Sequence, residues 1–131
     1  MDEISKEFRL FLLIEGIVAL IFAFLYLAIT DAYLEFTEWS YDDPYYPRAF
    51  GGTLLILGFF TLVAAYRKEW IKIRILVETG FLWMIMVTIM NILELIIITQ
   101  SSGAILNTIL NTVIIVIFIA GTIYFYLKER K

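Results

Sequence analysis

Three carboxylates stand within the apolar stretches of this 131-residue chain, at Glu15, Glu78 and Glu94. An ionisable side chain in lipid is costly, so each one requires a partner or a function. The chain has no His and no Cys, which excludes the zinc, haem and iron–sulfur sites that depend on these ligands. It also excludes a thiol nucleophile and a Ser–His pair. Little beyond proton transfer is left to the carboxylates, and we expect a non-enzymatic protein without a cofactor.

Glu15 and Glu78 are predicted to lie at a similar depth, on the side of the membrane that holds the chain termini. Arg74 precedes Glu78 by one helical turn, so a local ion pair accounts for Glu78. Glu15 lies six residues beyond Arg9, about 9 Å along a helix, which is too far for the same pairing. The two carboxylates are therefore candidates for a proton-linked pair. The alternative is that Arg74 or a backbone group holds Glu15.

A second group of polar residues is predicted on the opposite side of the membrane. Its members come from three helices and match in depth when counted from the helix ends: Arg48, Asn91, Glu94, Asn107 and Asn111. Arg48 is the only cation on that side and the natural partner of Glu94. The layer could fix the helices by hydrogen bonds, each worth about 0.6 kcal/mol, or form a small outward-opening pocket for a polar ligand or lipid headgroup. We favour the structural role.

Four apolar stretches must position these residues, each long enough for a helix across a bilayer core of about 30 Å. Hydrophobic residues make up 62% of the chain and charged residues 18%, whereas soluble domains have about 25% charged residues. The helices are expected at about 8–30, 49–66, 73–98 and 103–127. The sequence thus predicts one all-α domain over 1–131, an integral membrane antiparallel four-helix bundle. Its outer loop, 31–48, contains both prolines, Pro44 and Pro47.

Basic residues are distributed unevenly between the two sides. Nine of the ten Lys and Arg residues lie on the side of the termini, and only Arg48 lies on the other. The positive-inside rule then places both termini in the cytoplasm of a multi-pass cell-membrane protein. The basic face indicates contact with anionic lipid rather than nucleic acid. The acidic, aromatic outer loop indicates an interfacial belt or a docking surface, and its Asp42–Asp43 pair is a weak calcium signal.

Small side chains follow one face of each of the first two predicted helices. They are Gly16, Ala19 and Ala23 in the first helix and Gly51, Gly58 and Ala65 in the second. Because helices associate in lipid through close packing at small residues, we expect these faces to hold the bundle together. Either face could instead contact another subunit.

The start of the second predicted helix reads PRAFGGTLLILGFF and carries Arg48, Gly51 and Gly58. In these residues and in its four spans, the chain resembles the small membrane proteins of the DoxX-like and BphX-like kind. The resemblance implies a four-helix bundle, packing glycines and an outer ion pair for Arg48, and some members are subunits or accessories of membrane oxidoreductase systems. Length, four spans and Glu15 are also similar to small multidrug transporters, which exchange protons for a cationic drug. The strong charge bias departs from that family.

Three functions are compatible with these patterns. The one we favour is a subunit or accessory of a larger membrane assembly, which contacts other membrane subunits or a second copy through the small-residue faces and the outer loop. The second is a proton-coupled small-cation transporter that uses Glu15. The third is an outer-leaflet module that binds a ligand or lipid at the polar layer, and it requires a cavity between those side chains.

Overall fold

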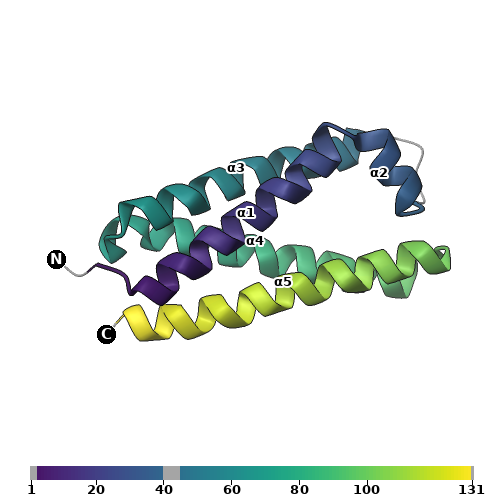
Figure 1. Ribbon diagram of the computed structural model, residues 1–131. Coiled ribbons are helices and arrows are strands. Elements are labelled where there is room, and N and C mark those ends of the chain that lie inside the picture. Colours follow the sequence, from purple (N-terminus) through teal and green to yellow (C-terminus); the bar gives the residue numbers. More distant parts are fainter. Residues whose placement is uncertain (1–2, 40–44, 131) are drawn as a thin grey trace.

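The computed structural model describes residues 3–39 and 45–130. Its long helices are α1 (Lys6–Leu27), α3 (Tyr45–Arg67), α4 (Trp70–Ile97) and α5 (Ser102–Glu129), and a short helix, α2 (Thr30–Phe36), follows α1 (Figure 1). All four long helices are apolar and long enough to cross a membrane, which confirms the four predicted stretches. Within the described ranges the chain is all-α, without a strand.

The segment 31–48, predicted as a loop, contains most of α2 and the first residues of α3, so the loop prediction is wrong there. A helix of seven residues is too short to be found by a criterion based on apolar length. One buried face holds α2 in place, because Thr30 and Tyr33 are buried. Thr30 Oγ1 donates to the carbonyl of Tyr26 at 2.5 Å, and the Tyr33 ring meets the Tyr26 ring edge-on at 5.0 Å.

Pro47 also departs from the prediction, since it lies in the first turn of α3 rather than before the helix. A proline is tolerated there because the N–H groups of a first turn have no acceptor within the helix. In the described residues α3 runs from Tyr45, whereas the sequence predicts a start near residue 49. The other predicted loop proline, Pro44, and the Asp42–Asp43 pair lie outside the described residues.

The helix ends show why the chain turns where it does. Ser5 Oγ accepts from the N–H of Phe8 at 3.3 Å at the start of α1, and Ser101 Oγ accepts from the N–H of Ala104 at 3.2 Å at the start of α5. Such caps satisfy N–H groups that the helix leaves free. Lys68, between α3 and α4, has a φ of 64°, a left-handed conformation that reverses the chain within a short connection.

The most extensive helix contact joins α1 to α3. A Cβ on Gly51 would lie 2.6 Å from the Cβ of Tyr26, and one on Gly58 would lie 3.1 Å from the Cβ of Ala19. A Cβ on Gly16 would lie 3.2 Å from the carbonyl oxygen of Gly58. The two predicted small-residue faces therefore pack against each other within the chain. At these glycines they leave no room for the side chains of another subunit.

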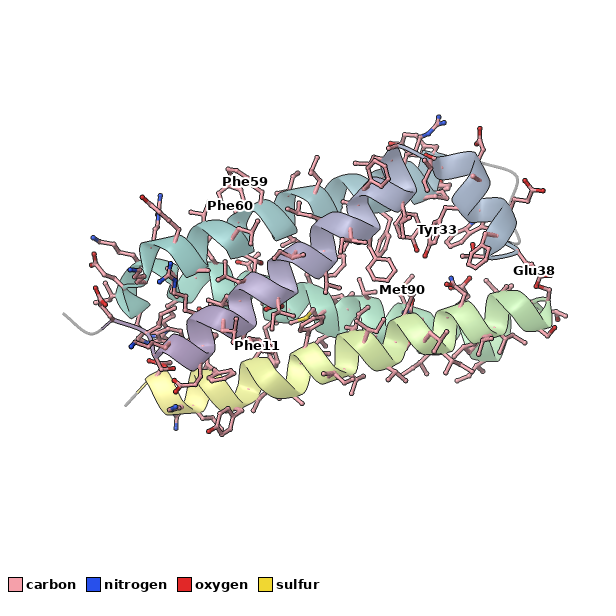
Figure 2. All side chains as sticks on the ribbon, viewed as in Figure 1. Phe11, Tyr33, Glu38, Phe59, Phe60 and Met90 are labelled. Atoms are coloured by element: carbon pink, nitrogen blue, oxygen red, sulfur yellow. The ribbon has the colours of Figure 1, made fainter. Side chains whose placement is uncertain are left out.

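α4 packs mainly against α5 and α3, and both chain termini lie at one end of the molecule, which we call the termini end (Figure 1). There Phe8 is fully buried and stacks on Phe125 with ring centroids 5.1 Å apart. Phe11 lies between α1 and α5, against Gly121 (Figure 2). The N–H of Ser5 donates to Glu129 Oε1 at 3.0 Å. Aromatic packing thus closes the termini end, and α2 lies at the opposite end.

Candidate functional site

A cavity of about 370 Å³ lies among the four long helices. Side chains from α1, α3, α4 and α5 line it, together with Trp39, which follows α2. Tyr46 and Met90 belong to its wall and are 70% and 60% exposed, so the cavity is open near these residues. Met90 belongs to α4 (Figure 2). Ligand pockets in proteins have volumes of about 300–1,000 Å³.

Three rings form one wall of the cavity, which we call the aromatic wall (Tyr26, Phe50 and Trp83). Phe50 stacks on Trp83 with ring centroids 5.6 Å apart and meets Tyr26 edge-on at 5.2 Å. The rings come from α1, α3 and α4, so they connect three helices at this level. Ring faces of this kind attract planar groups and cations.

Glu15 marks the end of the cavity that lies nearer to the chain termini. Glu15 and Gly80 line the cavity together, and both also border a second, small cavity of about 10 Å³. Among the described residues, no side chain donates a hydrogen bond to the Glu15 carboxylate or pairs with it. Arg74, the partner considered for Glu15 from the sequence, pairs with Glu78 instead.

Glu78 lies in a separate polar cluster. Its Oε1 accepts from Arg74 Nε at 2.7 Å and from the Tyr126 hydroxyl at 2.6 Å, so the ion pair expected from the one-turn spacing is present. Glu78 is not among the described residues that line the cavity. The structure therefore places Glu15 and Glu78 in different surroundings and does not show them as a pair that shares a proton.

Most of the predicted outer polar layer meets at the other end of the cavity, where the lining includes Asn91, Glu94, Asn107 and Asn111. Glu94 follows Gly80 by 14 residues (94 − 80), about 21 Å along α4 at 1.5 Å per residue. Glu15 and Glu94 thus mark opposite ends of one elongated cavity. Arg48 is the exception in the layer, because it is exposed and its Nε donates to Thr30 Oγ1 at 3.5 Å. The predicted ion pair between Arg48 and Glu94 is not formed.

Part of the polar layer also connects helices. Asn91 Nδ2 donates to Thr112 Oγ1 at 3.0 Å, which joins α4 to α5. The Tyr33 ring of α2 meets the Tyr26 ring edge-on at 5.0 Å, and burial raises the pKa of the Tyr33 hydroxyl. That hydroxyl therefore stays protonated near neutral pH. Asn91 thus connects two helices and also lines the cavity, so both interpretations of the layer stay open.

The α2 end of the cavity is positioned by Glu38. Ser101 Oγ donates to Glu38 Oε2 at 3.0 Å, and the carboxylate lies so close to Gly103 that a Cβ there would collide with it. Figure 2 shows Glu38 at the start of α5. Glu38 has a φ of 54°, and the next residue, Trp39, lines the cavity. This contact therefore fixes the backbone from which Trp39 reaches the cavity.

Several lining residues were not predicted as part of a site: Trp39, Tyr46, Phe50, Gly80 and Trp83. The sequence does not indicate that Phe50 and Trp83 belong to a site, because an aromatic residue in an apolar span can face lipid, a neighbouring helix or a cavity. Trp39 and Tyr46 resemble ordinary residues of an interfacial belt. Only the packing of four helices distinguishes these cases.

Comparison of the chain with protein-family models, with curated proteins and with solved structures gave no significant match. The resemblances to the DoxX-like and BphX-like proteins and to small multidrug transporters therefore stay predictions. Of the residues that carry the first resemblance, Gly51 and Gly58 pack closely between helices. Arg48 forms no ion pair with the described residues.

Proposed function

We propose that the chain is a non-enzymatic integral membrane protein that binds a small, mainly apolar molecule in the cavity among its four spans. In this proposal the spans form an antiparallel bundle with both termini in the cytoplasm. Four long apolar helices support the membrane location. Nine of ten cations on the side of the termini support the orientation. The polar end of the cavity then lies in the outer half of the bilayer.

The observation that carries the binding proposal is the contrast between the two ends of the molecule. At the termini end the helices fill the space between them, and Phe8 and Ile73 are completely buried. Toward α2, the same helices leave about 370 Å³. The walls there are mostly apolar, with a few polar groups gathered at one end, as is typical of sites that bind and orient a small molecule.

A neutral fluorophore, N-phenyl-1-naphthylamine, tests this proposal in lipid nanodiscs, with empty nanodiscs as the measure of partition into lipid. We expect saturable binding to the wild-type protein. Gly80→Phe should abolish it, because Gly80 lines the cavity and a Cβ there has no neighbour within 4 Å, so the ring can occupy the cavity. Gly52→Phe is the matched control, since the space around Gly52 is equally open and Gly52 does not line the cavity.

Two outcomes contradict the proposal. One is a wild-type signal that does not exceed the partition into empty nanodiscs. The other is equal saturable binding by Gly80→Phe and Gly52→Phe, which would place the probe outside the cavity.

Proton-coupled transport of a small cation is a second candidate, and the place of Glu15 in the cavity wall favours it. In vesicles with an imposed proton gradient, a transporter of this kind should lose cation movement in Glu15→Gln. Glu78→Gln should keep it, because Glu78 belongs to a separate cluster with Arg74 and Tyr126. A wild-type protein without proton-driven cation movement would end this candidate.

An accessory role in a larger membrane assembly is a third candidate. The small-residue faces pack within the chain, so of the predicted contact surfaces the one that stays exposed in the described residues is the side of α2 with Asp31, Glu35 and Phe36. Phe36 is 85% exposed. Purification in mild detergent should then yield a partner protein or a homo-oligomer that Phe36→Ser loses. A monodisperse monomer would contradict this role.

A further inference from the structure

In the part of the chain that the structure describes, two carboxyl groups and no basic side chain line the cavity. Glu15 and Glu94 line it, and no Lys or Arg of the described residues does. The two arginines that the sequence offers as partners are engaged elsewhere, since Arg74 pairs with Glu78 and Arg48 contacts Thr30. A charge in apolar surroundings is costly without a partner. The described chain therefore leaves two carboxyl groups in the cavity without a cationic partner.

The position of the aromatic wall adds a second feature to this site. Glu94 and Tyr26 both line the cavity. Tyr26 in turn contacts Phe50, and Phe50 stacks on Trp83. Carboxylate and ring faces together form the surroundings that bind an ammonium group, because the negative face of each ring adds its attraction to that of the carboxylate.

We propose that the ligand of the cavity is an organic cation, with an apolar, partly aromatic body and one ammonium group. This inference rests on the proposed binding function and adds the charge and chemical class of the ligand. The body of the ligand packs on the aromatic wall and on the aliphatic side chains around it. Glu94 at the outer end, or Glu15 at the inner end, balances the charge. A neutral molecule leaves both carboxyl groups without a charged partner, and an anion finds no basic side chain among the described residues of the lining.

Two probes of the same shape separate the contribution of the ligand's charge to binding from that of its apolar surface. Benzyltrimethylammonium and neopentylbenzene differ in one atom, a positively charged nitrogen in place of a carbon. Each is used to displace N-phenyl-1-naphthylamine from the protein in nanodiscs made of neutral lipid. We expect the cation to compete about tenfold more strongly than the neutral compound.

The double variant Glu15→Gln/Glu94→Gln should lose this preference for the cation, with competition by each compound compared against the variant's own saturable naphthylamine binding. Glu78→Gln is the matched control and should keep the preference, because its carboxylate lies outside the cavity lining. Equal competition by the two compounds in the wild-type protein, or an unchanged preference in the double variant, overturns the inference and leaves the proposed binding function in place. A wild-type protein with no saturable naphthylamine binding overturns both.

Discussion

The carboxylate of Glu38 accepts a hydrogen bond from the hydroxyl of Ser101 at 3.0 Å, and 63 residues of the chain separate the two. Ser101 is also the residue that caps α5. The contact therefore joins the segment after α2 to the start of the last helix, where the positive end of the helix dipole favours a carboxylate. Because Trp39 follows Glu38 and lines the cavity, this link connects the α2 end to the candidate site.

Glu38→Gln should loosen the segment that ends in Trp39. The substitution keeps the size of the side chain and removes the charge that Ser101 Oγ and the start of α5 attract. Hydrogen exchange of the amides from Tyr33 to Trp39 should become about threefold faster, since a charged hydrogen bond near a surface contributes modestly. Glu35→Gln, at an exposed position of α2, should leave the exchange rates unchanged. Equal rates in the two variants would show that Glu38 does not hold this segment.

Gly51→Ala and Gly52→Ala test the close packing of α1 against α3 with two neighbouring residues. A Cβ at Gly51 would lie 2.6 Å from the Cβ of Tyr26, whereas a Cβ at Gly52 has no neighbour within 4 Å. Gly51→Ala should lower the free energy of unfolding by about 1–3 kcal/mol, the usual cost of overpacking. Gly52→Ala should not lower it. Unfolding in mixed micelles measures both, and similar stability of the two variants would contradict the predicted contact.

Phe8→Ala should destabilise the termini end. Phe8 is 0% exposed and contacts the rings of Phe125 and Trp70. Removal of its ring leaves a void that should cost roughly 2 kcal/mol, mainly through lost packing because the surrounding lipid is itself apolar. Phe59→Ala is the control, since Phe59 is 58% exposed. Unfolding in mixed micelles measures the stability of both variants. An equal loss of stability in both would be incompatible with a packed cluster at Phe8.

The orientation can be tested with single cysteines, because the chain contains none. Phe36→Cys and Glu7→Cys place a thiol at exposed positions at opposite ends of the molecule. A membrane-impermeant maleimide added to intact cells should label Phe36→Cys only. Glu7→Cys should react only after the membrane is opened. The reverse pattern would contradict the orientation inferred from the basic residues.

The sequence predicts the four long helices well because long apolar stretches have few alternatives in a membrane protein. It also predicts the close packing at Gly16, Gly51 and Gly58 and the Arg74–Glu78 pair, since both follow from spacing along a helix. It misses α2, which is held by tertiary contacts of Tyr33 rather than by its own length.

The candidate site is only partly predictable, because spacing along the chain gives the depth of a residue but not the tertiary contacts of its side chain. The depth of Asn91, Glu94, Asn107 and Asn111 can be counted from the helix ends, and these residues do line one cavity. The rotation of each helix cannot be counted in this way, so Arg48 is wrongly paired with Glu94. Phe50 and Trp83 enter the site because α3 and α4 turn these rings toward each other, which is a property of packing and not of spacing along the chain.

Two methionines of α4 show whether a small molecule occupies the cavity. Met84 lines the cavity and is 6% exposed, whereas Met86 does not line it and is 57% exposed. Two residues along a helix correspond to about 200° of rotation, so the two side chains lie on nearly opposite faces. A naphthalene probe with a diazirine group can be photolysed in the nanodisc sample and its adducts mapped by mass spectrometry.

We predict that excess unlabelled N-phenyl-1-naphthylamine suppresses the adduct at Met84 and leaves the adduct at Met86 unchanged. An unlabelled Met84, or equal suppression at both positions, would contradict a ligand in the cavity.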